Sequence, residues 1–118
     1  MRFVALAALP LIAATAFPSA QAQENGAATR LITRGFYGEA EARLMRELRI
    51  YPDRPELLLN LAAVYARTGR VDAARSLYAR VLSKDEVLMD LASQRTAGSH
   101  GIAKTGLDRL APVQFTAR

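Results

Sequence analysis

Cysteine is absent from this 118-residue chain, and histidine occurs once, at position 100. The lack of cysteine excludes disulfides, thiolate metal sites, thiol nucleophiles and the lipid-modified cysteine of a bacterial lipoprotein. One histidine without cysteine partners or well-spaced carboxylates does not make a zinc site. We therefore expect no metal ion and no other cofactor. The length of the chain fits one small domain.

Acidic residues are outnumbered, with 11 Asp and Glu against 16 Lys and Arg, so the formal charge is +5. A basic balance can indicate nucleic acid, an anionic membrane surface or acidic proteins as partners. No aromatic residues suited to base stacking are interleaved with the arginines, and no groove-entering element is visible, so nucleic acid is not expected. A possible basic patch on the second helices comprises Arg43, Arg46, Arg49, Arg75 and Arg80. We interpret it as a solvated face.

A hydrophobic run long enough to span a membrane is also missing. The apolar stretch at residues 3–17 is shorter than the roughly 20 residues that cross a bilayer, and Pro10 interrupts it. Arg2 precedes the stretch, and Ala20-Gln21-Ala22 follows it with the small-x-small pattern of a cleavage site. This layout predicts a secretory signal peptide cleaved after Ala22, and hence a periplasmic or secreted protein. An uncleaved anchor or a buried N-terminal helix is the alternative.

Two short amphipathic helices are predicted between Pro55 and Leu82, with a turn at Gly69 between them. Asp53 is placed to accept hydrogen bonds from the first-turn N–H groups, and Glu56 occupies the position of a capping-box carboxylate. Gly69 provides the left-handed conformation that ends a helix. Apolar residues recur at helical spacing, as Leu58, Leu61, Ala62 and Tyr65 on the first helix and Val71, Ala74, Tyr78, Val81 and Leu82 on the second.

The same pattern occurs 34 residues upstream, and this period is the signature of a helix–turn–helix repeat. The matched pairs are Ala28 with Ala62, Leu31 with Tyr65, Gly35 with Gly69, Tyr37 with Val71, Ala40 with Ala74, Leu44 with Tyr78, Arg46 with Arg80 and Leu48 with Leu82. The upstream copy begins with a short predicted helix at 27–34. Its second helix ends before Pro52, because the residue before a proline disfavours the helical region.

These residues carry a resemblance to the tetratricopeptide repeat family. The segment 55–85 resembles one full repeat, and the upstream copy matches in its second helix through Gly35, Tyr37, Ala40, Leu44 and Pro52. The resemblance implies an all-α fold of antiparallel helical hairpins, with about one and a half repeats. It also implies a scaffold that binds proteins or peptides and is not an enzyme.

In this family the first helices of successive repeats line a concave groove. The positions that resemble groove positions here are Glu56, Leu59, Asn60, Ala63, Ala66 and Arg67. Asn60 resembles the Asn that some members use to hold a peptide backbone or a terminal carboxylate, but the upstream helix lacks the other residues of such a clamp. Leu59 either contacts a ligand or packs against the preceding short helix.

The C-terminal third is predicted to cap the repeats. Residues 85–98 fit either a helix or a short β-hairpin, because Val87, Met89 and Leu91 alternate. Ser99 can cap a further helix, whose apolar stripe consists of Ile102, Ala103, Leu107 and Leu110. Ser99 and His100 lack the surrounding pattern of a nucleophile elbow, so we expect no catalytic site.

The sequence thus divides into five segments. They are a signal peptide at 1–22, a loose N-terminus at 23–26, the repeat region at 27–84, a capping segment at 85–111 and a tail at 112–118. The function expected is an exported, non-catalytic adaptor that binds a protein or peptide in the cell envelope. The alternatives are a basic surface that binds anionic polymer or lipid headgroups, and a structural protein that associates with itself.

Overall fold

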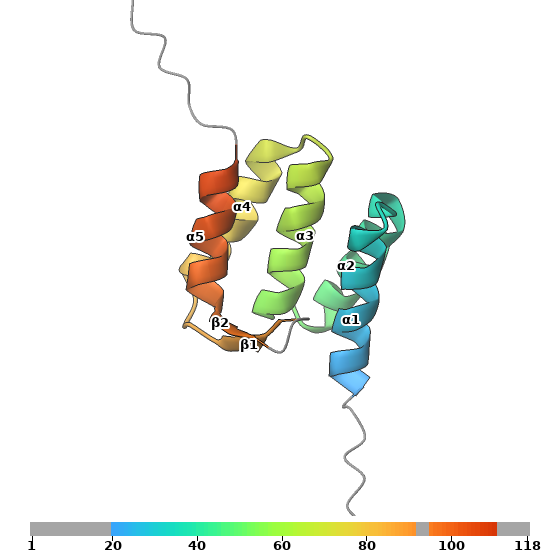
Figure 1. The fold of residues 1–118 in the computed structure, drawn as a ribbon, viewed down its shortest axis with the longest axis horizontal. Helices are drawn as coiled ribbons and strands as arrows, with labels where there is room; N and C mark the ends of the chain where they lie inside the picture. The colour runs from blue at the N-terminus through green and yellow to red at the C-terminus, as the bar shows by residue number, and fades with distance from the viewer. Residues whose placement is uncertain (1–19, 92–94, 111–118) are drawn as a thin grey trace, which may run out of the picture.

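The computed structural model describes residues 20–91 and 95–110, which form helices and one small antiparallel sheet. The elements are α1 (Ala20–Thr33), α2 (Tyr37–Ile50), α3 (Pro55–Arg67), α4 (Val71–Leu82), β1 (Leu88–Asp90), β2 (Thr96–Gly98) and α5 (Ser99–Arg109). Helices α1, α3 and α5 lie in one layer, and α2 and α4 lie behind them (Figure 1). The helical-hairpin fold predicted from the sequence is confirmed.

The two helical hairpins turn in the same way. Gly35 and Gly69 have φ angles of 81° and 79°, which a residue with a Cβ rarely adopts. The Gly35 N–H donates to the Ile32 carbonyl at 3.0 Å, and the Gly69 N–H donates to the Ala66 carbonyl at 3.4 Å. The residue after each glycine donates to the carbonyl five residues earlier. Both turns are therefore Schellman motifs, repeated at the 34-residue period.

Small residues lie where the helices of each pair approach each other. Ala28 and Ala40 are fully buried in the first pair, and Ala62 and Ala74 are fully buried in the second. Because an alanine side chain is a single methyl group, it lets two helix backbones come close without leaving a void. The repeat of these alanines at 34 residues therefore gives two helix pairs of similar geometry.

Helix α3 is the centre of the core. Leu57, Leu61 and Val64 pack with residues of α1 and α2 in one cluster. Leu58 and Leu59 pack with residues of α4 and α5 in a second cluster. Helix α3 is thus buried on two sides, which accounts for its apolar sequence. Leu59 packs toward α4 and α5, so of the two alternatives left open by the sequence, packing against the preceding short helix is not the one observed.

Helix α1 is longer than predicted. It begins at Ala20 and so includes residues 23–26, where a loose terminus was predicted. Alanine, glutamine and glutamate favour a helix, and Ala28 and Ile32 hold its second half in the core. The loose terminus was therefore wrong, and the first helix pair is complete where half a repeat was expected. Cleavage after Ala22 stays a prediction, and the tail at 112–118 lies outside the described residues.

Asp53 does not cap α3. The N-cap residue is Arg54, and no side chain there hydrogen bonds to the first turn. Asp53 instead accepts from Arg80 of α4 at 3.0 Å and lies 3.5 Å from Lys84. The predicted cap was wrong because two cations distant in sequence, Arg80 on α4 and Lys84 just after it, compete for the carboxylate. Pro55 occupies the first turn as predicted.

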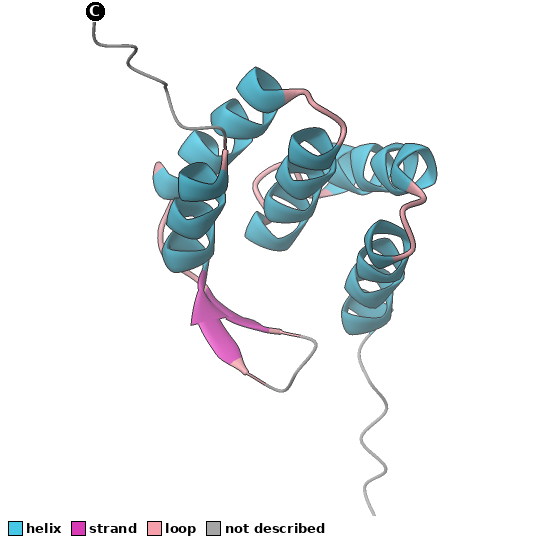
Figure 2. Cartoon of the chain, turned by 45° about the horizontal axis from the view of Figure 1, so that its top comes forward, coloured by secondary structure: helices cyan, strands magenta, loops and turns pink. Residues whose placement is uncertain are grey.

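The segment after α4 is a β-hairpin, one of the two alternatives left open by the sequence. Strands β1 and β2 pair antiparallel, with Met89 opposite Ala97. Helix α5 follows directly and packs on α4 and α3 through Ala103, which is fully buried, and Leu110. Figure 2 shows the hairpin extending from the start of α5 beyond the ends of the helices.

Candidate functional site

A groove of about 870 Å³ lies between α3, α5 and the β-hairpin. Its volume falls within the roughly 300–1,000 Å³ that is usual for ligand sites. Leu59, Asn60, Ala63, Ala66 and Arg67 of α3 line one wall. Their spacing of one, four, seven and eight residues from Leu59 places them on one helical face.

This wall contains five of the six residues that the sequence placed in a binding groove. The sixth, Glu56, is half-buried in the first turn of α3 and does not line the groove. The structure therefore brings the five together on one surface. Their role in binding stays a prediction.

Helix α5 supplies the second wall, which sequence reasoning missed. Its lining residues are Gly101, Ile102, Thr105, Gly106, Arg109 and the adjacent Leu110. Gly106 lies against the ring of Tyr78, and a Cβ on Gly106 would overlap that ring. Only glycine allows α5 to approach α4 this closely. The apolar stripe in the sequence predicted the helix α5. It did not predict that α5 packs beside α3, because that packing is a long-range contact.

The β-hairpin closes the groove on its third side. Met89, Leu91, Arg95 and Ala97 line it. Met89 and Ala97 are directly opposite in the ladder and so lie on the same face of the sheet. The Leu91 N–H donates to the Arg95 carbonyl at 2.7 Å, which extends the pairing beyond the strands. Leu88 lies on the other face and is 76% exposed.

Ser99 attaches the hairpin to α5. It is fully buried, its N–H donates to the Val87 carbonyl at 2.8 Å, and its hydroxyl accepts from the Val87 N–H at 2.9 Å. The N-cap of α5 is Gly98, so the predicted capping role of Ser99 was wrong. His100 donates from Nε2 to the Lys84 carbonyl at 2.6 Å. Both side chains thus make structural contacts to the segment between α4 and α5.

The charges in the groove are all positive. Arg67, Arg95 and Arg109 line it, and no Asp or Glu among the described residues does so. Burial raises the pKa of Tyr78, and the positive charges of Arg109 and Arg67 act against that rise. Tyr78 lines the same groove as these two arginines. A hollow lined by charge of one sign attracts the opposite charge.

Asn60 provides a neutral polar group on the α3 wall. It is half-buried, and its side chain makes no hydrogen bond to any residue within 20–91 and 95–110. An amide side chain carries two N–H donors and a carbonyl acceptor. It can therefore pair with the N–H and C=O groups of an extended peptide.

Across the described residues, no group of three or more His, Asp or Glu is arranged to hold a metal ion. Nor does any helix in that part of the chain have the length and apolar character needed to cross a membrane.

Comparison with known proteins connects the groove to a family. Residues 31–87 match the family model of the tetratricopeptide repeat, whereas no curated protein and no solved structure shows a significant match. The matched segment contains the whole α3 wall but ends before Arg95 and α5. Such repeats generally mediate protein–protein interaction through concave surfaces. Together with the two equivalent glycine turns, the match identifies residues 31–87 as a tetratricopeptide repeat region.

Proposed function

We propose that this protein is an exported, non-catalytic adaptor that binds a segment of another protein in the groove between α3, α5 and the β-hairpin. The observation that carries the proposal is the placement of Leu59, Asn60, Ala63, Ala66 and Arg67 along one wall of that groove. The signal-like leader at 1–22 supports export.

The chemistry of the wall suits a peptide segment. Ala63 and Ala66 leave room beside the backbone of α3, and Leu59 gives an apolar floor. The amide of Asn60, which has no hydrogen-bond partner among the described residues, can hold the backbone of a bound segment. Sites that combine an apolar surface with a few fixed polar groups are typical of specific ligand binding.

Site-specific photocrosslinking in the native host tests this function. A photoreactive residue replaces Ala63 in the groove, and a matched variant carries it at Ala79, on the exposed side of α4. We expect one discrete protein adduct from position 63 and none of that mass from position 79. Identical adducts from both positions, or none from either, would overturn the proposed binding site.

The exported location has its own test. Mass spectrometry of the protein from cell fractions should find a mature chain that begins at Gln23, in the periplasm or the medium. An intact chain that begins at Met1 and stays with the cytoplasmic fraction would contradict export without touching the binding site.

Self-association is a second candidate, because α2 and its flanks expose apolar side chains. Phe36, Met45, Ile50 and Tyr51 are 52%, 45%, 69% and 39% exposed. Exposed apolar surface often marks an interface. Light scattering should show a concentration-dependent dimer that Ile50→Glu disrupts; a monomer at high concentration would exclude this candidate.

A further inference from the structure

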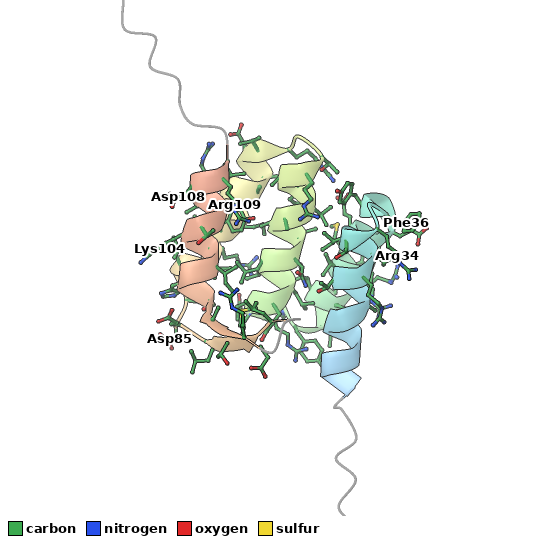
Figure 3. All side chains as sticks on the ribbon, in the orientation of Figure 1. Arg34, Phe36, Asp85, Lys104, Asp108 and Arg109 are labelled. Carbon is green, nitrogen blue, oxygen red and sulfur yellow. The ribbon has the colours of Figure 1, made fainter. Side chains whose placement is uncertain are left out.

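Three arginines reach the groove from three different elements. Arg67 belongs to the last turn of α3, Arg109 to the last turn of α5, and Arg95 directly precedes β2. Figure 3 shows Arg109 directed toward α3, whereas Lys104 and Asp108 on the same helix point away. Helices α3 and α5 end on the same side of the molecule, and the hairpin lies at their other ends (Figure 1). Cationic groups therefore lie at both ends of the groove.

These three arginines have no anionic partner within the described residues. Arg70, Arg75 and Arg80, on or beside α4, each form an ion pair with a carboxylate. Arg67, Arg95 and Arg109 form neither an ion pair nor a side-chain hydrogen bond in the described part of the chain.

A favourable interaction with the helix dipole partly explains the two arginines at helix ends. The helix dipole does not apply to Arg95. It also leaves the guanidinium hydrogen-bond donors of all three arginines without an acceptor among residues 20–91 and 95–110.

Apolar surface separates the two cationic ends. Ala63 and Ala66 of α3, Ile102 of α5 and Met89 of β1 line the same groove. A ligand that fits must therefore carry negative charge at its ends and apolar groups in between. Acidic residues that flank a short aliphatic or aromatic stretch in a peptide have this arrangement.

We propose that the groove selects a partner segment in which carboxylates flank apolar side chains, with Arg67 and Arg109 binding one end and Arg95 the other. The inference rests on the proposed function and specifies the ligand. The planar guanidinium group binds a carboxylate through two parallel hydrogen bonds, which gives both affinity and orientation.

The C-terminal segment thereby determines which peptide is bound. Arg95 and Arg109 both lie outside residues 31–87, the part that matches the family. A lipid surface fits this arrangement poorly, because the cations lie in a hollow around an apolar floor. The side-chain amide of Asn60 also suits a peptide backbone better than a headgroup.

Fluorescence anisotropy with three matched peptide pools tests the proposal on the full chain. All three pools have random apolar residues in the middle. The flanking residues are Asp and Glu in the acidic pool, Asn and Gln in the amide pool, and Lys in the basic pool. We expect the acidic pool to bind most tightly. Arg109→Gln and Arg95→Gln should each weaken the affinity for this pool about tenfold, because each removes a hydrogen bond to a charged group. Lys104→Gln removes the same charge from the outer face of α5 and should change the affinity less than about twofold.

The other outcomes separate the inference from the proposed function. Equal binding of the acidic and amide pools would overturn the acidic specificity and leave peptide binding intact. An equal loss of affinity for the acidic pool in Lys104→Gln and Arg109→Gln would show general charge attraction, and it would also overturn the acidic specificity of the groove. Binding of phosphatidylglycerol vesicles in an Arg109-dependent way, with no pool bound, would overturn both. Arg109→Lys keeps the positive charge but loses the planar guanidinium group with its two parallel hydrogen bonds, so it should retain part of the affinity. Urea unfolding checks that each variant is folded.

Discussion

Gly106 of α5 lies against the ring of Tyr78 on α4, so closely that the space of a Cβ at position 106 is already occupied by ring atoms. Tyr78 is 6% exposed and belongs to the core cluster formed by α3, α4 and α5. The contact therefore sets the position of α5 on the repeat. It also sets the width of the groove, since both residues line it.

Gly106→Ala should destabilise the protein. The added methyl group must displace a buried ring or the helix itself, and overpacking of this kind costs about 1–3 kcal/mol. That cost exceeds the roughly 1 kcal/mol gained when alanine replaces glycine inside a helix. Urea unfolding followed by circular dichroism measures the net loss.

Gly101 is the matched control on the same helix. Apart from the adjacent backbone of its own helix, no described atom lies within 4 Å of a Cβ built there, so Gly101→Ala should stabilise by about 0.5–1 kcal/mol through helix propensity alone. Two substitutions of the same type should therefore change the free energy of unfolding in opposite directions. Equal effects would contradict the close contact with Tyr78.

Glu41 of α2 and Arg70, at the start of α4, join the two helix pairs by two hydrogen bonds of 2.8 and 2.7 Å. Arg70 also lies 4.3 Å over the ring of Tyr65. The hydrogen bonds from Arg70 hold the pKa of Glu41 below its ordinary value of 4.5. In an NMR titration, Arg70→Gln should raise the pKa of Glu41 toward that value, whereas Arg75→Gln, which removes a pair confined to α4, should not.

The same pair predicts a dependence of stability on pH. Because the folded pKa of Glu41 is below its unfolded value of 4.5, the pair stabilises the fold above pH 4.5 and loses this effect as the pH falls through the folded pKa. The difference in urea midpoint between the wild type and Glu41→Gln should be full at pH 7 and should shrink below pH 4.5. A difference that does not change with pH would rule out an ionic contribution from the pair.

Ser99→Ala tests the attachment of the hairpin. The change leaves the Val87 N–H without the acceptor at 2.9 Å, and an unsatisfied, partly buried donor costs about 1–3 kcal/mol. Hydrogen exchange of the Val87 amide should accelerate at least about tenfold, since exchange reports local opening. Ser76, whose hydroxyl donates from an exposed position to the Asp72 carbonyl, is the control. Ser76→Ala should leave both stability and the Val87 exchange rate nearly unchanged.

Local patterns predicted the repeat well. Gly35 and Gly69 adopt the left-handed conformation expected of them, and the buried alanines recur at 34 residues. Sequence periodicity records such features because each depends on neighbours within one or two turns. The α3 wall could be assigned for the same reason: its residues lie on one face of a single helix.

Long-range partners could not be predicted in this way. Asp53 is drawn to Arg80 and Lys84, and the hydroxyl of Ser99 pairs with Val87, both across turns of the chain. Arg95 and Arg109 become groove residues only when α5 packs beside α3. Single-sequence patterns give no measure of that packing, so half of the groove was not foreseen.

The most direct test of the groove is to fill it. Ala63→Phe places a large side chain in the hollow lined by Asn60 and Ala66, and Ala79→Phe places the same side chain on the exposed face of α4. Affinity for the crosslinked partner, measured by calorimetry on folded variants, should fall at least about tenfold for Ala63→Phe and stay within about twofold for Ala79→Phe. Full affinity in Ala63→Phe would contradict binding in the groove between α3, α5 and the β-hairpin.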